Sequence, residues 1–184
     1  ICNWAMGITY NNFNIGQLKM PELRKTIITV IWLILYFLPQ QAEELQFRQI
    51  TKEDGLAASN CNDVLEDSRG FIWIFTQSGI SRYDGYSFTN YAYTPNNNNS
   101  LPSDGNFSHP TEDTYGNIWA IAETNGVICY LRKKDAFVHY QHDPEISSSL
   151  SHNIVNDILL DKKGELWLAT GHGLNHYHYH TNSF

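Results

Sequence analysis

Three aspartates recur at one place in a repeated pattern and are the first candidates for carboxylate chemistry. Asp67, Asp113 and Asp161 each stand three residues before a glycine and six residues before a tryptophan. Paired carboxylates can catalyse glycoside hydrolysis. A catalytic residue is needed only once, however, and Asp followed by Gly suits a tight turn. We therefore predict no catalytic residue in this chain and a structural repeat formed by Asp67, Gly70, Trp73, Asp113, Gly116, Trp119, Asp161, Gly164 and Trp167.

A run of alternating histidines and tyrosines offers a second kind of chemistry. If residues 176–180 form a strand, His176, His178 and His180 lie on one face, where imidazoles could bind Zn²⁺ or Ni²⁺. Neighbours on one strand face are about 7 Å apart, which is wide for joint coordination of one ion. Tyr177 also belongs to the packing face of the repeat. We therefore expect the three histidines to point outward, with no metal site and no cofactor.

An aromatic and polar stretch is the remaining candidate for ligand contact. It contains Tyr86, Tyr91, Tyr93, Asp84 and Asn90. Tyrosine rings pair an apolar face with a polar tip, which suits contact with sugars. Packing within the repeat explains Tyr91 equally well, so the ligand-binding residues stay unassigned. The sequence has no nucleophile motif, phosphate loop or HExxH motif.

The elements that carry these residues follow from the spacing of the tryptophans. Trp73 and Trp119 are 46 residues apart, and Trp119 and Trp167 are 48 apart. A period of 40 to 50 residues built from short strand-like runs is typical of β-propeller blades. The first copy predicts strands at 61–66, 71–76, 80–83 and 86–91. The fold class is therefore all-β, a propeller fragment of about three four-stranded antiparallel blades over residues 57–91, 103–140 and 152–184.

Three local departures from the period carry their own predictions. The first strand of the second blade contains His109-Pro110, and proline cannot donate to a strand ladder, so we expect this strand to be short or irregular. Phe184 aligns with the fourth-strand phenylalanines of the other blades, so the fourth strand of the third blade only begins. Residues 45–50 resemble an outer strand, and we expect them to close a ring.

The N-terminal part has the plan of a targeting segment. Residues 20–42 combine the basic pair Arg24-Lys25, an apolar run over 26–38 and the sequence Pro39-Gln-Gln-Ala42, as in a secretory signal peptide. The run is short for a membrane span, although an uncleaved anchor is the alternative. We interpret residues 1–19 as upstream or over-called sequence and residues 43–184 as the exported propeller part.

Composition narrows the class of partner. The chain has 12 basic and 19 acidic residues, and no basic stripe, which disfavours nucleic-acid binding. The cysteines are Cys2, Cys61 and Cys129. Export would permit a disulfide between Cys61 and Cys129, but their spacing does not require one, and we favour buried free thiols.

The sequence motif of the repeats resembles that of a known family. Residues 66–85 and 161–175, with the lead-in Ile50-Thr-Lys-Glu-Asp-Gly-Leu56, are similar to two-component regulator propeller repeats. The resemblance covers about residues 45–184 and is weakest in the middle copy, where Ala122 replaces a threonine. It implies a periplasmic sensor of a hybrid two-component system, in which further blades precede a membrane helix, a histidine kinase and a receiver, often with a DNA-binding domain. It also implies a homodimer anchored in the inner membrane.

Two classes of function follow. The resemblance favours a periplasmic propeller that detects an oligosaccharide for the control of glycan-utilisation genes, with kinase activity in other parts of the parent protein. The alternative is an exported propeller that acts on glycans as an enzyme or binds them as a scaffold. The alternative requires a carboxylate pair facing the central channel, and none stands out in the sequence.

Overall fold

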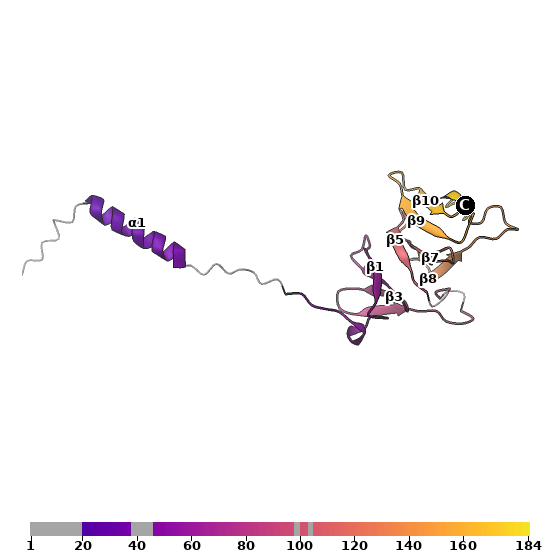
Figure 1. Cartoon of the computed structure of the whole chain (residues 1–184), viewed down its shortest axis with the longest axis horizontal. Helices are drawn as coiled ribbons and strands as arrows, with labels where there is room; N and C mark the ends of the chain where they lie inside the picture. The colour runs from indigo at the N-terminus through magenta and orange to yellow at the C-terminus, as the bar shows by residue number, and fades with distance from the viewer. Residues whose placement is uncertain (1–19, 38–45, 98–99, 103–104) are drawn as a thin grey trace, which may run out of the picture. The chain divides into compact units, whose positions relative to one another are not determined.

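The chain divides into two units, residues 1–47 and 48–184. The computed structural model describes residues 20–37, 46–97, 100–102 and 105–184 (Figure 1). The predicted upstream segment 1–19 lies outside the described residues, as do residues 38–42 of the predicted signal peptide and Leu45 of the predicted ring-closing strand.

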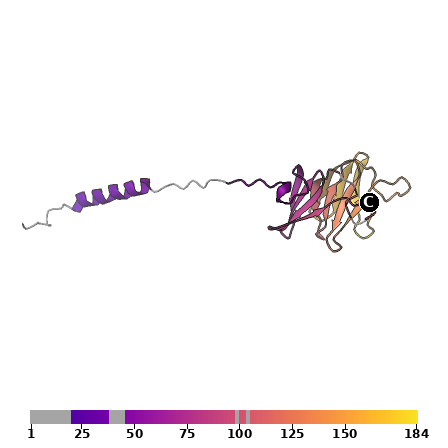
Figure 2. The same cartoon turned by 90° about the horizontal axis from the view of Figure 1, so that it is seen from below.

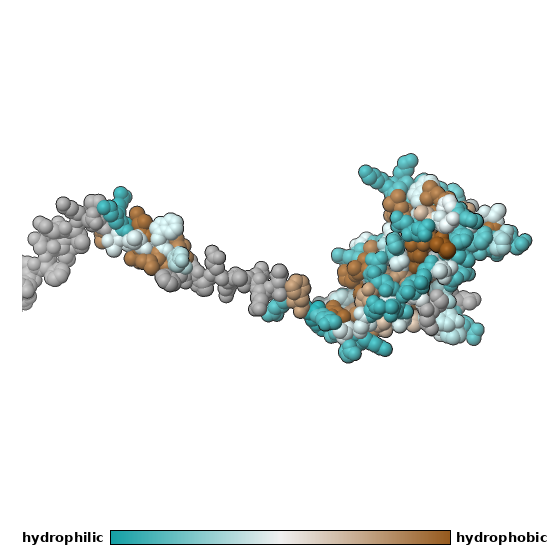
Figure 3. Space-filling view, in the orientation of Figure 1, coloured by the Kyte–Doolittle hydropathy of each residue, from teal (hydrophilic) through white to brown (hydrophobic). Residues whose placement is uncertain are grey.

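The described residues of the first unit contain one helix, α1 (Met20–Phe37). Its apolar side chains between Ile27 and Tyr36 are exposed (Figure 3). The Thr29 hydroxyl donates a hydrogen bond to the backbone carbonyl of Lys25, one turn earlier in the helix, at 2.7 Å. Among the described residues, no helix combines the length and the apolar character that crossing a membrane requires. The signal-peptide assignment stays a prediction.

The second unit consists of three antiparallel sheets formed by consecutive strands. The first sheet contains β1 (Cys61–Glu66), β2 (Ile72–Thr76), β3 (Gly79–Tyr83) and β4 (Phe88–Tyr91). The second contains β5 (Ser108–Glu112), β6 (Ile118–Ile121), β7 (Val127–Leu131) and β8 (Ala136–Tyr140). The third contains β9 (Val155–Leu160), β10 (Leu166–Thr170) and β11 (Gly173–Tyr177).

The sheets share one arrangement. Each is a meander in which every strand pairs with the next, and the first strand of the second sheet, β5, contacts both β1 and β9 (Figures 1 and 2). This arrangement confirms the predicted all-β fold with four-stranded, four-stranded and incomplete sheets. After β11 the chain turns, and His178 and Ser183 form an isolated bridge before Phe184.

Two strands depart from regular geometry for identifiable reasons. In β5 the pairing register shifts between Ser108 and Thr111, and His109 has φ 51°, which confirms the irregular strand predicted from His109-Pro110. The fourth strand of the first sheet begins at Phe88, two residues later than predicted. The carboxylate of Asp84 accepts hydrogen bonds from the backbone N–H groups of Tyr86 and Ser87, which holds these residues in the turn.

The lead-in to the first sheet is a loop. Residues 46–50 are not in a strand, and a short 3₁₀ helix, η2 (Lys52–Asp54), follows. Leu56 is then buried, as are Leu101 and Leu150 in the loops that precede the second and third sheets. The segment before the first sheet therefore places a buried leucine where the loops before the second and third sheets also place one. The ring-closing role of residues 45–50 stays a prediction.

The hydrophobic core lies between sheets and not within one of them. One cluster joins the first and second sheets around Trp73, Phe75, Phe107 and Phe137. The other joins the second and third sheets around Trp119, Leu150, Leu166 and Tyr177. We call these contacts the first interface and the second interface.

The cysteines only half match the expectation. Both described cysteines are free thiols; Cys129 is buried in β7, but Cys61 is exposed. Cys61 opens β1 next to a register shift, at the exposed end of the strand. Burial raises the pKa of the Cys129 thiol, which keeps it protonated and unreactive.

Two glycines allow the cost of a positive φ angle to be separated from the cost of a steric clash with the backbone. Gly126 and Gly70 have nearly equal φ values of 81° and 82°, but a Cβ at Gly126 would lie 2.1 Å from the Tyr140 carbonyl oxygen. Nothing lies within 4 Å of a Cβ at Gly70. We expect Gly70→Ala to cost about 1–2 kcal/mol, the left-handed conformation alone, and Gly126→Ala to cost clearly more. Urea denaturation of both variants measures the difference, and equal losses would contradict the role of the Tyr140 contact.

Candidate functional site

The repeated aspartates are anchors of a turn that holds a tryptophan. In the first sheet, Oδ1 of Asp67 accepts hydrogen bonds from the backbone N–H groups of Arg69 and Phe71, at 2.9 and 3.1 Å. Oδ2 accepts the indole N–H of Trp73 at 2.9 Å. One carboxylate therefore fixes both the hairpin loop and the orientation of the buried ring.

The other two copies repeat this geometry. The indole N–H of Trp119 donates to Asp113 at 2.9 Å, and that of Trp167 donates to Asp161 at 3.3 Å. The third glycine of the set, Gly164, has φ 81°, as the predicted turn requires. Because these carboxylates are occupied by their own turns, the contacts favour the structural interpretation of the whole set.

An arginine connects the first turn to the second sheet. The Arg132 guanidinium lies 2.9 Å from both Asp67 and Glu112, and its Nε–H donates to the Gly116 carbonyl. Glu112 also accepts the backbone N–H and the hydroxyl of Ser68. The sequence patterns gave no sign of this network, because its members are up to 65 residues apart and meet only when the sheets pack.

The hydrogen bonds of the turns lower the pKa values of two of the turn aspartates, Asp67 and Asp161. Burial acts to raise the pKa of Asp67, but hydrogen bonds from Trp73, Arg69, Phe71 and Arg132 outweigh it and lower that pKa below its usual value. The pKa of Asp161 is lowered chiefly by the backbone N–H of Glu165. Each group binds its proton less tightly in the folded chain than in the unfolded chain.

This difference predicts sensitivity to acid. A lowered pKa in the folded state contributes stability that is present above the unfolded value of about 3.9 and is lost as pH falls through the folded pKa. We expect the urea midpoint to fall progressively below about pH 4 and to fall less steeply in Asp161→Asn. Midpoints that stay constant down to acid pH would contradict this linkage.

The two interfaces contain the same aromatic cluster. In the first, Trp73 stacks on Tyr91 at 5.8 Å and contacts Tyr130 at 4.8 Å, and Phe137 lies 5.3 Å from both tyrosines. The second interface repeats these contacts with the corresponding residues Trp119, Tyr140, Tyr177 and Phe184. The alignment of Phe184 with Phe137 is thus a structural equivalence.

A shared acceptor completes each cluster. Asp135 accepts the hydroxyls of Tyr130 and Tyr91 at 2.6 and 3.2 Å. Asn182 accepts the hydroxyls of Tyr177 and Tyr140 in the same way. The shared acceptor was not among the predicted features, although Tyr-x₄-Asp/Asn recurs in the second and third repeats.

The third tryptophan differs from the other two. Trp73 and Trp119 are 1% exposed, whereas Trp167 is only partly buried. Trp167 stacks on His176 at 4.2 Å, the residue opposite it on β11. Among the described residues, no sheet covers this face of β10 and β11.

The three alternating histidines line one hollow, and the His176 and His178 rings lie 4.7 Å apart, but the strand does not extend over all three. His176 lies in β11, His178 forms an isolated bridge, and His180 lies in the turn that follows. The strand ends at Tyr177 because the chain turns back to form the bridge from His178 to Ser183. Across the described parts of the chain, no three His, Cys, Asp or Glu side chains gather closely enough to hold a metal ion.

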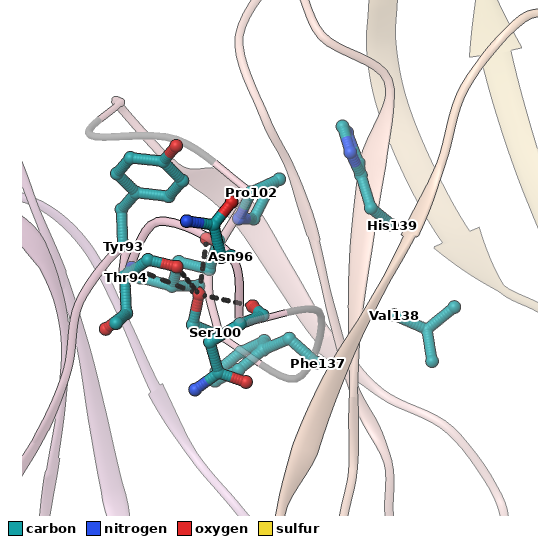
Figure 4. Close-up of a pocket in the computed structure, with 10 residues that line it drawn as sticks. Tyr93, Thr94, Asn96, Ser100, Pro102, Phe137, Val138 and His139 are labelled. Carbon is teal, nitrogen blue, oxygen red and sulfur yellow. Dashed lines mark hydrogen bonds between the residues drawn. The ribbon is translucent and has the colours of Figure 1, made fainter.

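The tyrosines of the aromatic and polar stretch do not lie together in one site. Tyr91 belongs to the first interface, and Tyr86 is 96% exposed in its turn. Tyr93 lines a hollow of about 530 Å³ that also includes Asn96, Phe137 and His139 (Figure 4). Ser100 fixes the adjoining loop through its hydroxyl, which donates to the Thr94 carbonyl and accepts the Thr94 N–H (Figure 4).

Comparison with known proteins agrees with this geometry. A family model for the two component regulator propeller matches residues 149–172, which cover β9 and β10. Histidine kinase P4 from Formosa agariphila is 31% identical over 64 residues, which are 35% of this chain and 5% of that protein.

Two solved structures show the same fold. Both are extracellular domains from B. thetaiotaomicron that are described as belonging to hybrid two component systems, BT3049 and BT4673. The first superposes with a TM-score of 0.66 at 24% identity over 74% of this chain and 19% of that one. The second gives a TM-score of 0.52 at 24% identity over 66% of this chain and 16% of that one.

The chain therefore spans a small part of the proteins it matches. The matched residues 149–172 include β9 and β10 of the third sheet, and the aspartate–tryptophan turn contact of that sheet recurs in the other two. The chain has the fold of part of a β-propeller, and its residues 149–172 match the two-component regulator propeller repeat.

Proposed function

We propose that this chain is the ligand-sensing propeller part of an exported hybrid two-component sensor histidine kinase/response regulator. The observation that carries the proposal is the match of a two-component regulator propeller repeat to residues 149–172, on a fold shared with extracellular domains described as belonging to such systems. The kinase-named relative supports it. Phosphotransfer would then belong to other parts of the parent protein, which acts as a membrane-anchored homodimer.

The proposed ligand is an oligosaccharide, and the proposed output is the control of glycan-utilisation genes. Exposed tyrosine beside amide side chains, as at Tyr93 and Asn96, suits contact with a sugar ring and its hydroxyls. Export would use residues 20–42 as a signal peptide, with the basic pair Arg24-Lys25 in the first half of α1.

Export has a direct test. Alkaline phosphatase, which is active only outside the cytoplasm, is fused after Phe184. We expect activity from the fusion and a loss of most of it in the double variant Arg24→Glu, Lys25→Glu. The matched control is Lys52→Glu, a charge change outside the proposed signal segment. An inactive fusion, or activity that ignores Arg24 and Lys25, would contradict the export route.

Sensing is tested with the full-length gene in its own host. Transcripts are compared between strains with and without the gene, grown on a panel of purified oligosaccharides. We expect one oligosaccharide to induce a set of glycan-breakdown genes only when the gene is present, and to bind the purified protein in calorimetry. If the purified protein instead hydrolyses that oligosaccharide, or if no transcript depends on the gene, the sensor proposal fails.

A further inference from the structure

Two hollows open at one end of the second and third sheets. Their volumes are about 520 and 360 Å³, and they share Tyr115, Tyr177, Tyr179 and His180. The Tyr115 and Tyr179 rings lie 4.9 Å apart and inclined at 51°, and we call this pair the aromatic wall. Tyr115 is 58% exposed, so one face of the wall is open to a ligand.

The lysines of these two sheets gather at the same end. In an antiparallel meander the turns after the first and third strands lie at one end of the sheet. All lysines of the described residues 105–184 lie in such turns, namely Lys133, Lys134, Lys162 and Lys163. Lys133 and Lys134 line the smaller hollow and Lys163 lines the larger one. Asp113, Asp135, Asp161 and Glu165 stand in or beside the same turns, but of these four only Glu165 lines either hollow, so most of the charged side chains that face the hollows are lysines.

Lys133 and Lys134 have no carboxylate beside them in the lining of their hollow, whereas Lys163 lies close enough to Asp161 to help lower the pKa of that carboxylate. The lining of the smaller hollow contains no Asp or Glu, and no salt bridge of the described residues includes Lys133, Lys134 or Lys163. Glu165 lines the larger hollow, but its carboxylate faces His176 at 3.5 Å. Charged groups without a partner in a concave site favour a ligand of opposite charge.

A buried hydroxyl points to the same conclusion independently. Tyr179 lines both hollows, and its hydroxyl oxygen is buried without a hydrogen-bond partner among the described residues. Burial and the nearby carboxylate of Asp113 raise the pKa of Tyr179, so the group stays a donor at neutral pH. Asp113 does not accept it, because its two oxygens already take four other donors. A buried donor of this kind calls for an acceptor.

We propose that the two hollows form a binding site for an acidic oligosaccharide, one that carries sulfate or carboxylate groups on its rings. A sugar ring packs on Tyr115, its acidic groups meet Lys133 and Lys134, and a ligand oxygen accepts the Tyr179 hydroxyl. The net negative charge of the chain disfavours long polyanions such as nucleic acids, whereas a short acidic sugar fits hollows of this size. The inference deepens the proposed sensor function and rests on it.

The test measures binding to the purified full-length protein by calorimetry. The probes are a sulfated disaccharide, a disaccharide of hexuronic acid, the neutral disaccharide with the same linkage as the sulfated one, and inorganic sulfate alone. We expect both acidic disaccharides to bind about tenfold or more tightly than the neutral one, and to weaken as salt is added. Inorganic sulfate should bind weakly, because it lacks a ring to pack on Tyr115.

Matched variants separate ligand binding from a structural role. The double variant Lys133→Gln, Lys134→Gln and the variant Tyr115→Ala should each weaken binding about tenfold, and Tyr115→Phe should restore it. Tyr179→Phe should weaken binding while leaving the melting temperature unchanged or raised, because it removes a buried donor without a partner. Lys162→Gln is the control, since Lys162 lies in the same turn as Lys163 but lines neither hollow.

Several outcomes would overturn the site. They are equal binding of acidic and neutral disaccharides, equal loss in Lys162→Gln, or binding of inorganic sulfate as tight as that of the sulfated disaccharide. An acidic peptide that binds as tightly as the sugars would show a protein-docking surface instead. If none of the acidic sugars binds but the transcript test still responds to a neutral oligosaccharide, only the ligand class fails and the sensor function stands.

Discussion

Replacing Trp119 by alanine is expected to remove about 3–5 kcal/mol of stability, enough to unfold most small domains. The Trp119 ring is 1% exposed, packs on Tyr140 of its own sheet and contacts Tyr177 of the next sheet at 4.7 Å. Its loss leaves a cavity in the second interface and removes one of the two hydrogen bonds that Oδ2 of Asp113 accepts. Urea denaturation followed by circular dichroism measures the loss.

The matched control is Trp167→Ala. Trp167 has the same turn contact and the same sequence setting, but it is partly exposed and stacks on His176 alone among the aromatic rings. We expect it to lose less than half as much stability as Trp119→Ala. Equal losses would mean that the turn contact, and not packing between sheets, determines the role of the tryptophans.

The second large effect is expected for Asp67→Asn. The Asp67 side chain is fully buried and receives hydrogen bonds from two backbone N–H groups, the Trp73 indole and the Arg132 guanidinium. If the asparagine amide nitrogen takes the place of Oδ2, its N–H groups face the Trp73 indole N–H and the Arg132 guanidinium, which are donors as well. The buried arginine then loses Asp67 as an ion-pair partner. Removing one member of a buried ion pair costs about 3–5 kcal/mol, and we expect a loss in this range.

A double-mutant cycle makes this prediction specific. Arg132→Gln alone should also destabilise the chain, and the double variant Asp67→Asn, Arg132→Gln should lose about 1–3 kcal/mol less than the sum of the single losses. Asp161→Asn is the control, because Asp161 holds the same turn without an arginine. Strict additivity of the two single effects would contradict a coupled pair.

Local chemistry explains which parts of the fold could be predicted. Asp and Gly fix each hairpin loop, so the strands on both sides of Gly70, Gly116 and Gly164 follow from residues within one turn. The break in β5 follows equally from Pro110. The fourth strand of the first sheet begins late because Asp84 uses its own side chain to hold the turn. A propensity argument overlooks this contact, since Tyr86 reads as a strand residue.

The contacts between sheets could not be predicted in the same way. Tyr91, Tyr130 and Asp135 meet through the packing of two sheets, and each residue alone has an ordinary explanation within its own strand. No pattern in the sequence distinguishes Arg132 from the other basic residues, yet its side chain is almost buried between two carboxylates. The repeat did contain a signal, the recurrence of Tyr-x₄-Asp/Asn, but only the sheet geometry shows what it connects.

The placement of the core has a consequence for how such chains can be recombined. Because the buried aromatic clusters lie between sheets, the second sheet supplies half of two different cores. Exchanging it for a blade of another propeller would replace Tyr130 and Phe137 on one side and Trp119 and Tyr140 on the other. A transplanted blade is therefore compatible only if it matches both neighbours, so the unit that can be inherited or engineered as a module is the interface and not the individual blade.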